Sequence, residues 1–87
     1  MRLIHGRWVQ QGLFNRVSRQ VKNRIELLKP GAAYTVKEIC GGLFWKQLSS
    51  GDPKLAGSCV AELVERGELR LRSAGRNAAN SLLYSAH

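Results

Sequence analysis

The chain has 87 residues, a length that suits one domain with a small hydrophobic core. Hydrophobic residues make up 44% of the sequence and charged residues 23%, proportions that are ordinary for a soluble globular protein. No apolar run approaches the roughly 18 residues that a transmembrane helix needs, so no membrane-spanning segment is expected.

Positive charge dominates the composition, with 14 Lys and Arg residues against 6 Asp and Glu and a net charge of +8. Nine of the cations are arginine, whose planar guanidinium suits bidentate binding of phosphate or carboxylate. Residues 1–30 carry most of the excess, residues 31–67 are neutral, and residues 68–87 are basic again. This charge on so small a surface predicts an acidic partner: nucleic acid, an anionic membrane or an acidic protein.

Metal and disulfide sites are not expected. Cys40 and Cys59 are too few for a disulfide scaffold and fall within helical patterns, so we interpret them as small buried apolar residues. The histidines, His5 and His87, stand near the two ends, and no Cys-x-x-Cys pair exists to hold zinc. The sequence therefore predicts neither a metal nor a cofactor.

The sequence also does not predict an enzyme. The acids are scattered without an evident pair of carboxylates, the serines have no base partner, and Gly41-Gly42 lacks the Lys-Ser or Lys-Thr of a phosphate-binding loop. No secretory signal is apparent, and we expect a cytoplasmic protein, nucleoid-associated if the source is bacterial. The arginine-rich, acid-poor start leaves a mitochondrial presequence as an alternative.

The first predicted element is a helix from about residue 16 to 28, with or without an earlier turn near 8–14. Its apolar residues recur at helical spacing: Val9, Leu13, Val17, Val21, Ile25 and Leu28. Pro30 and Gly31 end it. Its other side carries the cations Arg16, Arg19, Lys22 and Arg24. This basic side is either an ordinary solvated face or a surface that meets phosphates.

The middle of the chain predicts a stub of strand at 33–35 and a second helix at 36–40. Thr35 and Glu38 have the spacing of a capping box, in which each side chain binds the other residue's backbone N–H. Gly41-Gly42 then weakens or breaks the helix. Trp45 follows within an apolar stretch and is most simply a core or edge residue, with partner binding as the alternative.

A third helix and a hairpin complete the chain. Asp52 is expected to cap the helix, Pro53 suits its first position, and Gly67 ends it. Its buried stripe is Leu55, Ala56, Cys59, Val60, Leu63 and Val64. Alternation at 68–72 predicts a strand with Leu69 and Leu71 on one side, followed by a loop at 73–80 and a second strand at 81–85.

This order of elements resembles the winged helix-turn-helix superfamily. Two stretches carry the resemblance, Tyr34–Cys40 at the start of the second helix and Val60–Leu69 at the passage from the third helix to the hairpin. It covers roughly residues 17 to 86 and implies an α+β, mainly α fold with a three-helix core and a C-terminal β-hairpin wing. Residues 16–87 would form this domain, and residues 1–15 a basic arm or extra helical turn. The apolar hairpin residues expected to pack on the helices are Leu69, Leu71, Leu82 and Tyr84.

The resemblance implies duplex DNA binding, because DNA-binding members place the third helix in the major groove and the wing on the backbone or minor groove. We therefore expect a small transcriptional regulator or a phage or mobile-element accessory factor. Its candidate contacts are Arg16, Arg19, Lys22, Lys54, Gly57, Ser58, Arg70, Arg72, Arg76 and Asn77. The solvent face expected for the third helix has few residues that read bases: it consists of Lys54, Gly57, Ser58, Ala61, Glu62 and Glu65.

Two other functions remain open at this point. One is a protein-interaction module, an adaptor or inhibitor that docks on an acidic surface of a nucleic-acid-processing complex. Trp45 is its candidate contact, whereas Trp8 and Phe14 of the first segment are candidates for the homodimer contact of a DNA-binding regulator. The other is binding to a membrane surface through the basic first helix. The apolar stripe of that helix is needed for the core, which disfavours membrane binding.

Overall fold

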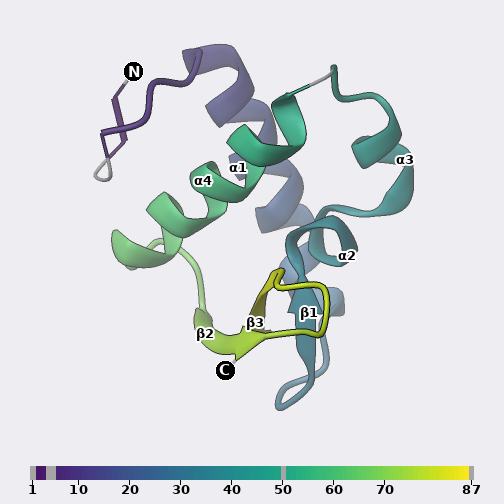
Figure 1. The fold of residues 1–87 in the computed structure, drawn as a ribbon. Helices are drawn as coiled ribbons and strands as arrows, with labels where there is room; N and C mark the ends of the chain where they lie inside the picture. Colours follow the sequence, from purple (N-terminus) through teal and green to yellow (C-terminus); the bar gives the residue numbers. More distant parts are fainter. Residues whose placement is uncertain (1, 4–5, 50, 87) are drawn as a thin grey trace.

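The computed structural model describes residues 2–3, 6–49 and 51–86. Within these residues the fold is α+β and mainly helical, with four α-helices and a three-stranded antiparallel sheet (Figure 1). The elements in chain order are α1 (Gln11–Arg24), the 3₁₀ turn η1 (Ile25–Leu27), β1 (Ala33–Thr35), α2 (Val36–Cys40), α3 (Gly42–Lys46), α4 (Asp52–Glu65), β2 (Leu71–Arg76) and β3 (Leu82–Ala86).

Helix α1 begins at Gln11, earlier than the predicted start near residue 16. Gly12 does not interrupt it, because it lies in the first turn, where the backbone N–H groups have no partners within the helix in any case. The buried stripe continues through that turn with Leu13 and Phe14. Leu3 and Val9 also lie in the core, so the N-terminal segment packs against the rest of the chain.

The predicted capping box at α2 is confirmed. The backbone N–H of Glu38 donates to Thr35 Oγ1 at 3.2 Å, and the backbone N–H of Thr35 donates to Glu38 Oε1 at 2.9 Å. The glycine pair separates two helices instead of ending helical structure. Gly41 has a φ of +92°, which turns the chain, and α3 then starts anew with Phe44 and Trp45 packed against the core. The sequence did not predict α3.

Helix α4 starts one residue before the predicted first position. Its N-cap is Gly51, so Asp52 is the first helical residue and not the cap, and Pro53 is the second. The end of the helix is as predicted: Gly67 has a φ of +73°. The N–H of Glu68 donates to the carbonyl oxygen of Leu63, and that of Gly67 to Val64, both at 3.1 Å, the bonding pattern of a Schellman motif.

One polar residue of α4 is buried against expectation. Glu62, expected on the solvent face, is 0% exposed. Its Oε2 accepts a hydrogen bond from Arg66 Nε at 2.6 Å, and Arg66 in turn lies over the ring of Phe14 at 5.4 Å. A buried carboxylate is tolerated when it is paired and hydrogen-bonded in this way.

The sheet has the strand order β1-β3-β2, with Tyr34 paired to Tyr84 and Arg72 to Ser85. β2 begins later and runs further than predicted, to Arg76, so that the loop shortens to residues 77–81. An irregularity between Ser73 and Arg76, where Gly75 has a φ of +89°, lets pairing continue beyond the point where alternation stops.

Three of the four apolar hairpin residues are buried as expected: Leu69, Leu71 and Tyr84. Leu82 is instead 36% exposed. It lies two residues before Tyr84 and faces the same side of the strand, but it pairs with Arg76 at the loop end of the hairpin, where the surface is more open.

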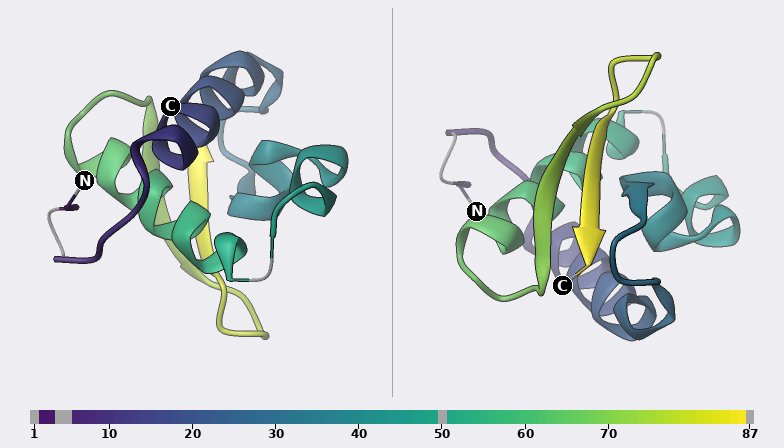
Figure 2. Two further views of the ribbon diagram at one scale, coloured as in Figure 1. Left: turned by 90° about the horizontal axis from the view of Figure 1, so that it is seen from above. Right: turned by 90° about the horizontal axis from the view of Figure 1, so that it is seen from below.

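The helices lie on one face of the sheet (Figure 1). α1 packs against α4 and α2, and the hairpin runs beneath α4, so that its loop end lies on the side of α4 opposite α1 (Figure 2). The core includes Val17, Val21, Ile39, Val60 and Leu63. In the described part of the chain, no helix combines the length and hydropathy needed to cross a membrane.

Candidate nucleic-acid interface

An open groove of about 850 Å³ lies along the outer face of α4. α4 and the start of α2 border it, Trp45 of α3 lies on one side, and the loop end of the hairpin lies on another. We call this surface the α4–hairpin groove. Its lining residues are Arg7, Thr35, Val36, Lys37, Trp45, Pro53, Lys54, Gly57, Ser58, Ala61, Arg76, Ser81, Leu82 and Tyr84.

The charge of this groove is entirely of one sign. Among the described residues that line it there are four cations and no acid: Arg7, Lys37, Lys54 and Arg76. All four are exposed to solvent. Like charges gathered around a concave surface concentrate their potential there, so the groove attracts anions.

The floor of the groove is made of small residues of α4. Gly57, Ser58 and Ala61 are half-buried and follow one another along this face. The hydroxyl of Ser58 donates to the backbone carbonyl of Lys54 at 3.3 Å, within its own helix. A Cβ at Gly57 would meet nothing within 4 Å outside its own helix backbone and immediate neighbours, so a ligand can reach the backbone there.

The hairpin wall is stiffened by its own loop. Arg76 Nη1 donates to the carbonyl oxygen of Asn80 at 2.9 Å, which holds the guanidinium across the loop end. Asn77 Oδ1 accepts from the backbone N–H groups of Ala79 and Ser81, each at 3.0 Å. Arg76 is thus positioned beside the groove, whereas the side-chain carbonyl of Asn77 is occupied by hydrogen bonds within the turn.

The structure brings together five of the residues predicted for binding: Lys54, Gly57, Ser58, Arg76 and Trp45. Trp45 is half-buried in the wall of the groove rather than freely exposed. Two further cations, Arg7 and Lys37, were not predicted. Both reach the groove through tertiary packing, and only the general excess of positive charge in the N-terminal segment pointed towards Arg7.

The predicted contacts on α1 do not join this groove, since α1 lies on the other side of α4 from the hairpin loop (Figure 2). Arg16 lies over the ring of Phe44 at 5.8 Å, and Lys22 pairs with Glu68 at 3.5 Å. Arg19 is exposed. These cations therefore lie outside the groove.

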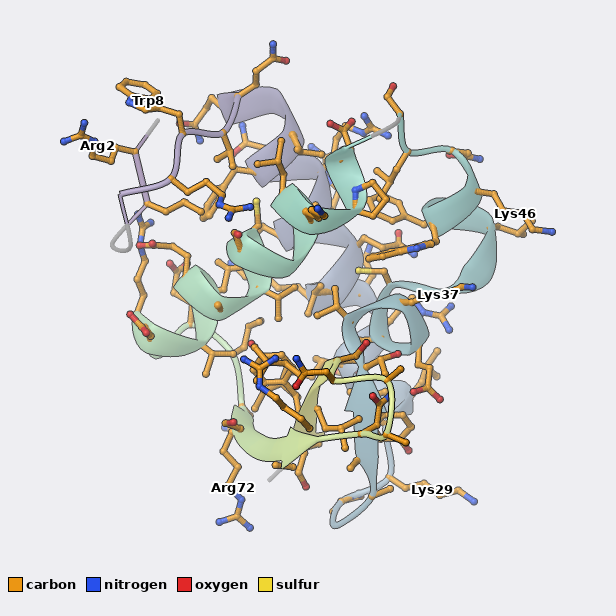
Figure 3. The ribbon with its side chains drawn as sticks, viewed as in Figure 1. Arg2, Trp8, Lys29, Lys37, Lys46 and Arg72 are labelled. Atoms are coloured by element: carbon orange, nitrogen blue, oxygen red, sulfur yellow. The ribbon has the colours of Figure 1, made fainter. Side chains whose placement is uncertain are left out.

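Two hairpin arginines also lie outside the groove. Arg70 precedes β2 and is exposed. Arg72, within β2, extends away from the body of the molecule (Figure 3). Strict alternation would place Arg72 and Arg76 on the same face of β2, but the irregularity between Ser73 and Arg76 shifts the register, so Arg72 pairs with Ser85 while Arg76 pairs with Leu82 at the loop end, where the groove lies.

The aromatic residues predicted for partner binding differ in exposure. Trp8 is 66% exposed and has the guanidinium of Arg2 6.0 Å from its ring (Figure 3). Phe14 is 6% exposed and belongs to the core, covered by Arg66. Only Trp8 of this pair offers a surface to a partner.

The cysteines are buried, as the sequence predicted, and both are free thiols. Burial raises the pKa of Cys40 and of Cys59 to about 11, so neither forms a thiolate readily at neutral pH. Among the residues described, no cluster of His, Cys, Asp and Glu has the makings of a metal site.

Comparison with known proteins adds no relative: no protein-family model, curated protein or solved structure matches this chain.

Proposed function

We propose that this protein binds duplex DNA through the α4–hairpin groove and that its fold is a winged helix-turn-helix. A role as a small transcriptional regulator, or as an accessory factor of a phage or mobile element, fits this activity. The order of helices, the β1 strand and the hairpin that follows α4 support the fold. The proposed partner is the DNA phosphate backbone, with the N-terminal segment contributing Arg7.

The observation that carries the proposal is the charge of the groove. Four cations and no acid line it among the described residues, although residues 31–67 are neutral overall. The fold therefore gathers cations from four separate segments around one helix face. Phosphate contacts of this kind supply most of the affinity of a protein for DNA.

The first test is a fluorescence-anisotropy titration of a duplex at several salt concentrations. If the four cations each neutralise one phosphate, the slope of log K against log salt is about −3.6, and affinity falls about 150-fold between about 50 and 200 mM salt. A flat salt dependence, or no binding at about 50 mM salt, contradicts the proposal.

A matched pair of variants locates the binding surface. Lys54→Ala/Arg76→Ala removes two cations of the groove and is expected to reduce the magnitude of the salt slope by about 2. Lys29→Ala/Lys46→Ala removes the same charge from side chains that extend away from the molecule elsewhere (Figure 3). Equal losses in both variants would show that net charge, and not the groove, determines binding.

The wall of the groove favours one alternative. Trp45, Val36 and Leu82 add apolar surface beside the cations, which suits an acidic amphipathic segment of a protein. Such a partner would make the protein an adaptor or inhibitor. Saturable binding of an acidic helical peptide that added duplex DNA does not displace would favour this function over DNA binding.

A further inference from the structure

We infer, on the basis of the proposed DNA binding, that the α4–hairpin groove receives one sugar–phosphate strand of the duplex and does not select a base sequence. A sequence-specific DNA-binding protein inserts its helix into the major groove of the duplex, whereas here one strand of the duplex lies in a groove of the protein.

The first support is the position of α4 behind the loop end of the hairpin. The loop end of the hairpin projects beyond α4 on the groove side, as both views in Figure 2 show. Residues of α3 and α2 border the groove as well. A helix that enters the major groove must protrude, because that groove is only about 12 Å wide. The part of a duplex that protrudes is its backbone, and this shape matches a helix face that lies behind a projecting hairpin loop.

The second support is the chemistry of the floor. Long side chains with several hydrogen-bonding atoms read base edges, chiefly Arg, Lys, Asn and Gln. The part of α4 that lines the groove offers only Lys54 of this kind, and lysine acts as a point charge. Ser58 already donates its hydroxyl within the helix. Phosphate contacts position a protein on DNA but carry no sequence information.

The third support is Gly57 on the floor of the groove. Glycine is among the least favourable residues for a helix interior. Nothing in the fold fills the space above it, since an added Cβ would meet nothing within 4 Å outside its own helix backbone and immediate neighbours. The bare backbone leaves room for a strand to approach closely between the cations, which together supply the attraction.

The test is a substitution that fills the space above Gly57. Gly57→Leu places an apolar side chain on the floor without changing charge, and Gly12→Leu places the same side chain at an equally open position on α1. Binding is measured on A·T-only, G·C-only and mixed duplexes of one length. We expect Gly57→Leu to weaken binding to all three about tenfold or more, because packed atoms leave no room for the strand. Gly12→Leu is expected to bind as the unchanged protein does.

Sequence independence is measured on the unchanged protein with the same duplexes and a random-sequence selection. The three affinities are expected to agree within about threefold, whereas a specific reader prefers its site by about a thousandfold or more. A preferred site of that strength overturns the inference and leaves the proposed DNA binding intact. So does a Gly57→Leu variant that binds all duplexes normally.

Loss of folding is a separate outcome that circular dichroism detects. If Gly57→Leu does not fold, Gly57→Ala takes its place, with an expected affinity loss of about threefold, because one methyl group occupies less of the floor. Unchanged binding by that variant overturns the inference. Absence of DNA binding by the unchanged protein at about 50 mM salt removes both the inference and the proposed function.

Discussion

Two glycines associated with α4 are expected to respond in opposite directions to the same substitution. Gly57 lies inside the helix, and Gly67 is the residue that ends it, with a φ of +73°. A Cβ at either position meets nothing within 4 Å outside the immediate backbone, so packing does not decide the result. The backbone conformation alone does.

The magnitudes follow from helix propensity and backbone strain. Gly57→Ala is expected to raise the free energy of unfolding by about 1 kcal/mol, the difference between alanine and glycine in a helix interior. Gly67→Ala is expected to lower it by about 1 kcal/mol, because a Cβ in the left-handed region is strained. For a domain of this size, the melting temperatures of the two variants should differ by about 8–16 °C.

The assay is thermal and urea unfolding followed by circular dichroism on both variants and the unchanged protein. Shifts of the same sign would refute the reasoning, because they would mean that contacts and not conformation control the response. Destabilisation by Gly57→Ala in particular would show that the floor of the groove is not open. A variant that gains stability yet loses affinity for DNA would separate the needs of the fold from those of the groove.

Three further predictions concern the core and the groove. Arg66→Ala should lower the free energy of unfolding by about 2–4 kcal/mol in urea titrations, because its guanidinium pairs with the buried carboxylate of Glu62. Lys22→Ala, which breaks the exposed pair with Glu68, should lower the free energy of unfolding by less than about 1 kcal/mol. Equal losses of stability in the two variants would contradict the larger contribution expected from the pair with the buried carboxylate. Burial raises the pKa of both cysteine thiols to about 11, so the folded state favours the neutral thiols. Their contribution to stability is therefore complete below about pH 9 and decreases as the pH rises towards 11, a decline that a variant with alanine at both positions should reduce. In a Trp8→Phe protein the remaining fluorescence comes from Trp45, and added duplex should change its emission because this side chain lines the groove; unchanged emission at saturation would place the DNA elsewhere.

Local patterns in the sequence were sufficient for most of the fold. The capping box at Thr35 and Glu38, the buried stripe of α4 and the left-handed Gly67 each depend on residues a few positions apart. Hydrogen bonds and strain at this range act in almost any context, so they can be predicted from a single sequence. The α+β, mainly helical class followed from them.

Tertiary packing decided the features that local patterns could not. Glu62 is polar, yet it is buried because its carboxylate pairs with Arg66, one turn later in the chain. The guanidinium of Arg66 also lies over the ring of Phe14, a residue of α1. Phe14 is likewise in the core because the helix α1 extends back through Gly12. Burial depends on what lies opposite a side chain, and neighbours distant in sequence determine that.

The same reason explains what was and was not predicted about the site. Composition alone establishes that the protein is strongly basic, and local patterns identified Lys54, Gly57, Ser58 and Arg76 as candidate contacts. Whether these four share one groove with Arg7 and Lys37, and on which side of α4 the cations of α1 lie, depends on how the chain packs. Net charge is a sum over residues and is independent of fold, but an electrostatic surface depends on which side chains the packing of helices and hairpin brings together.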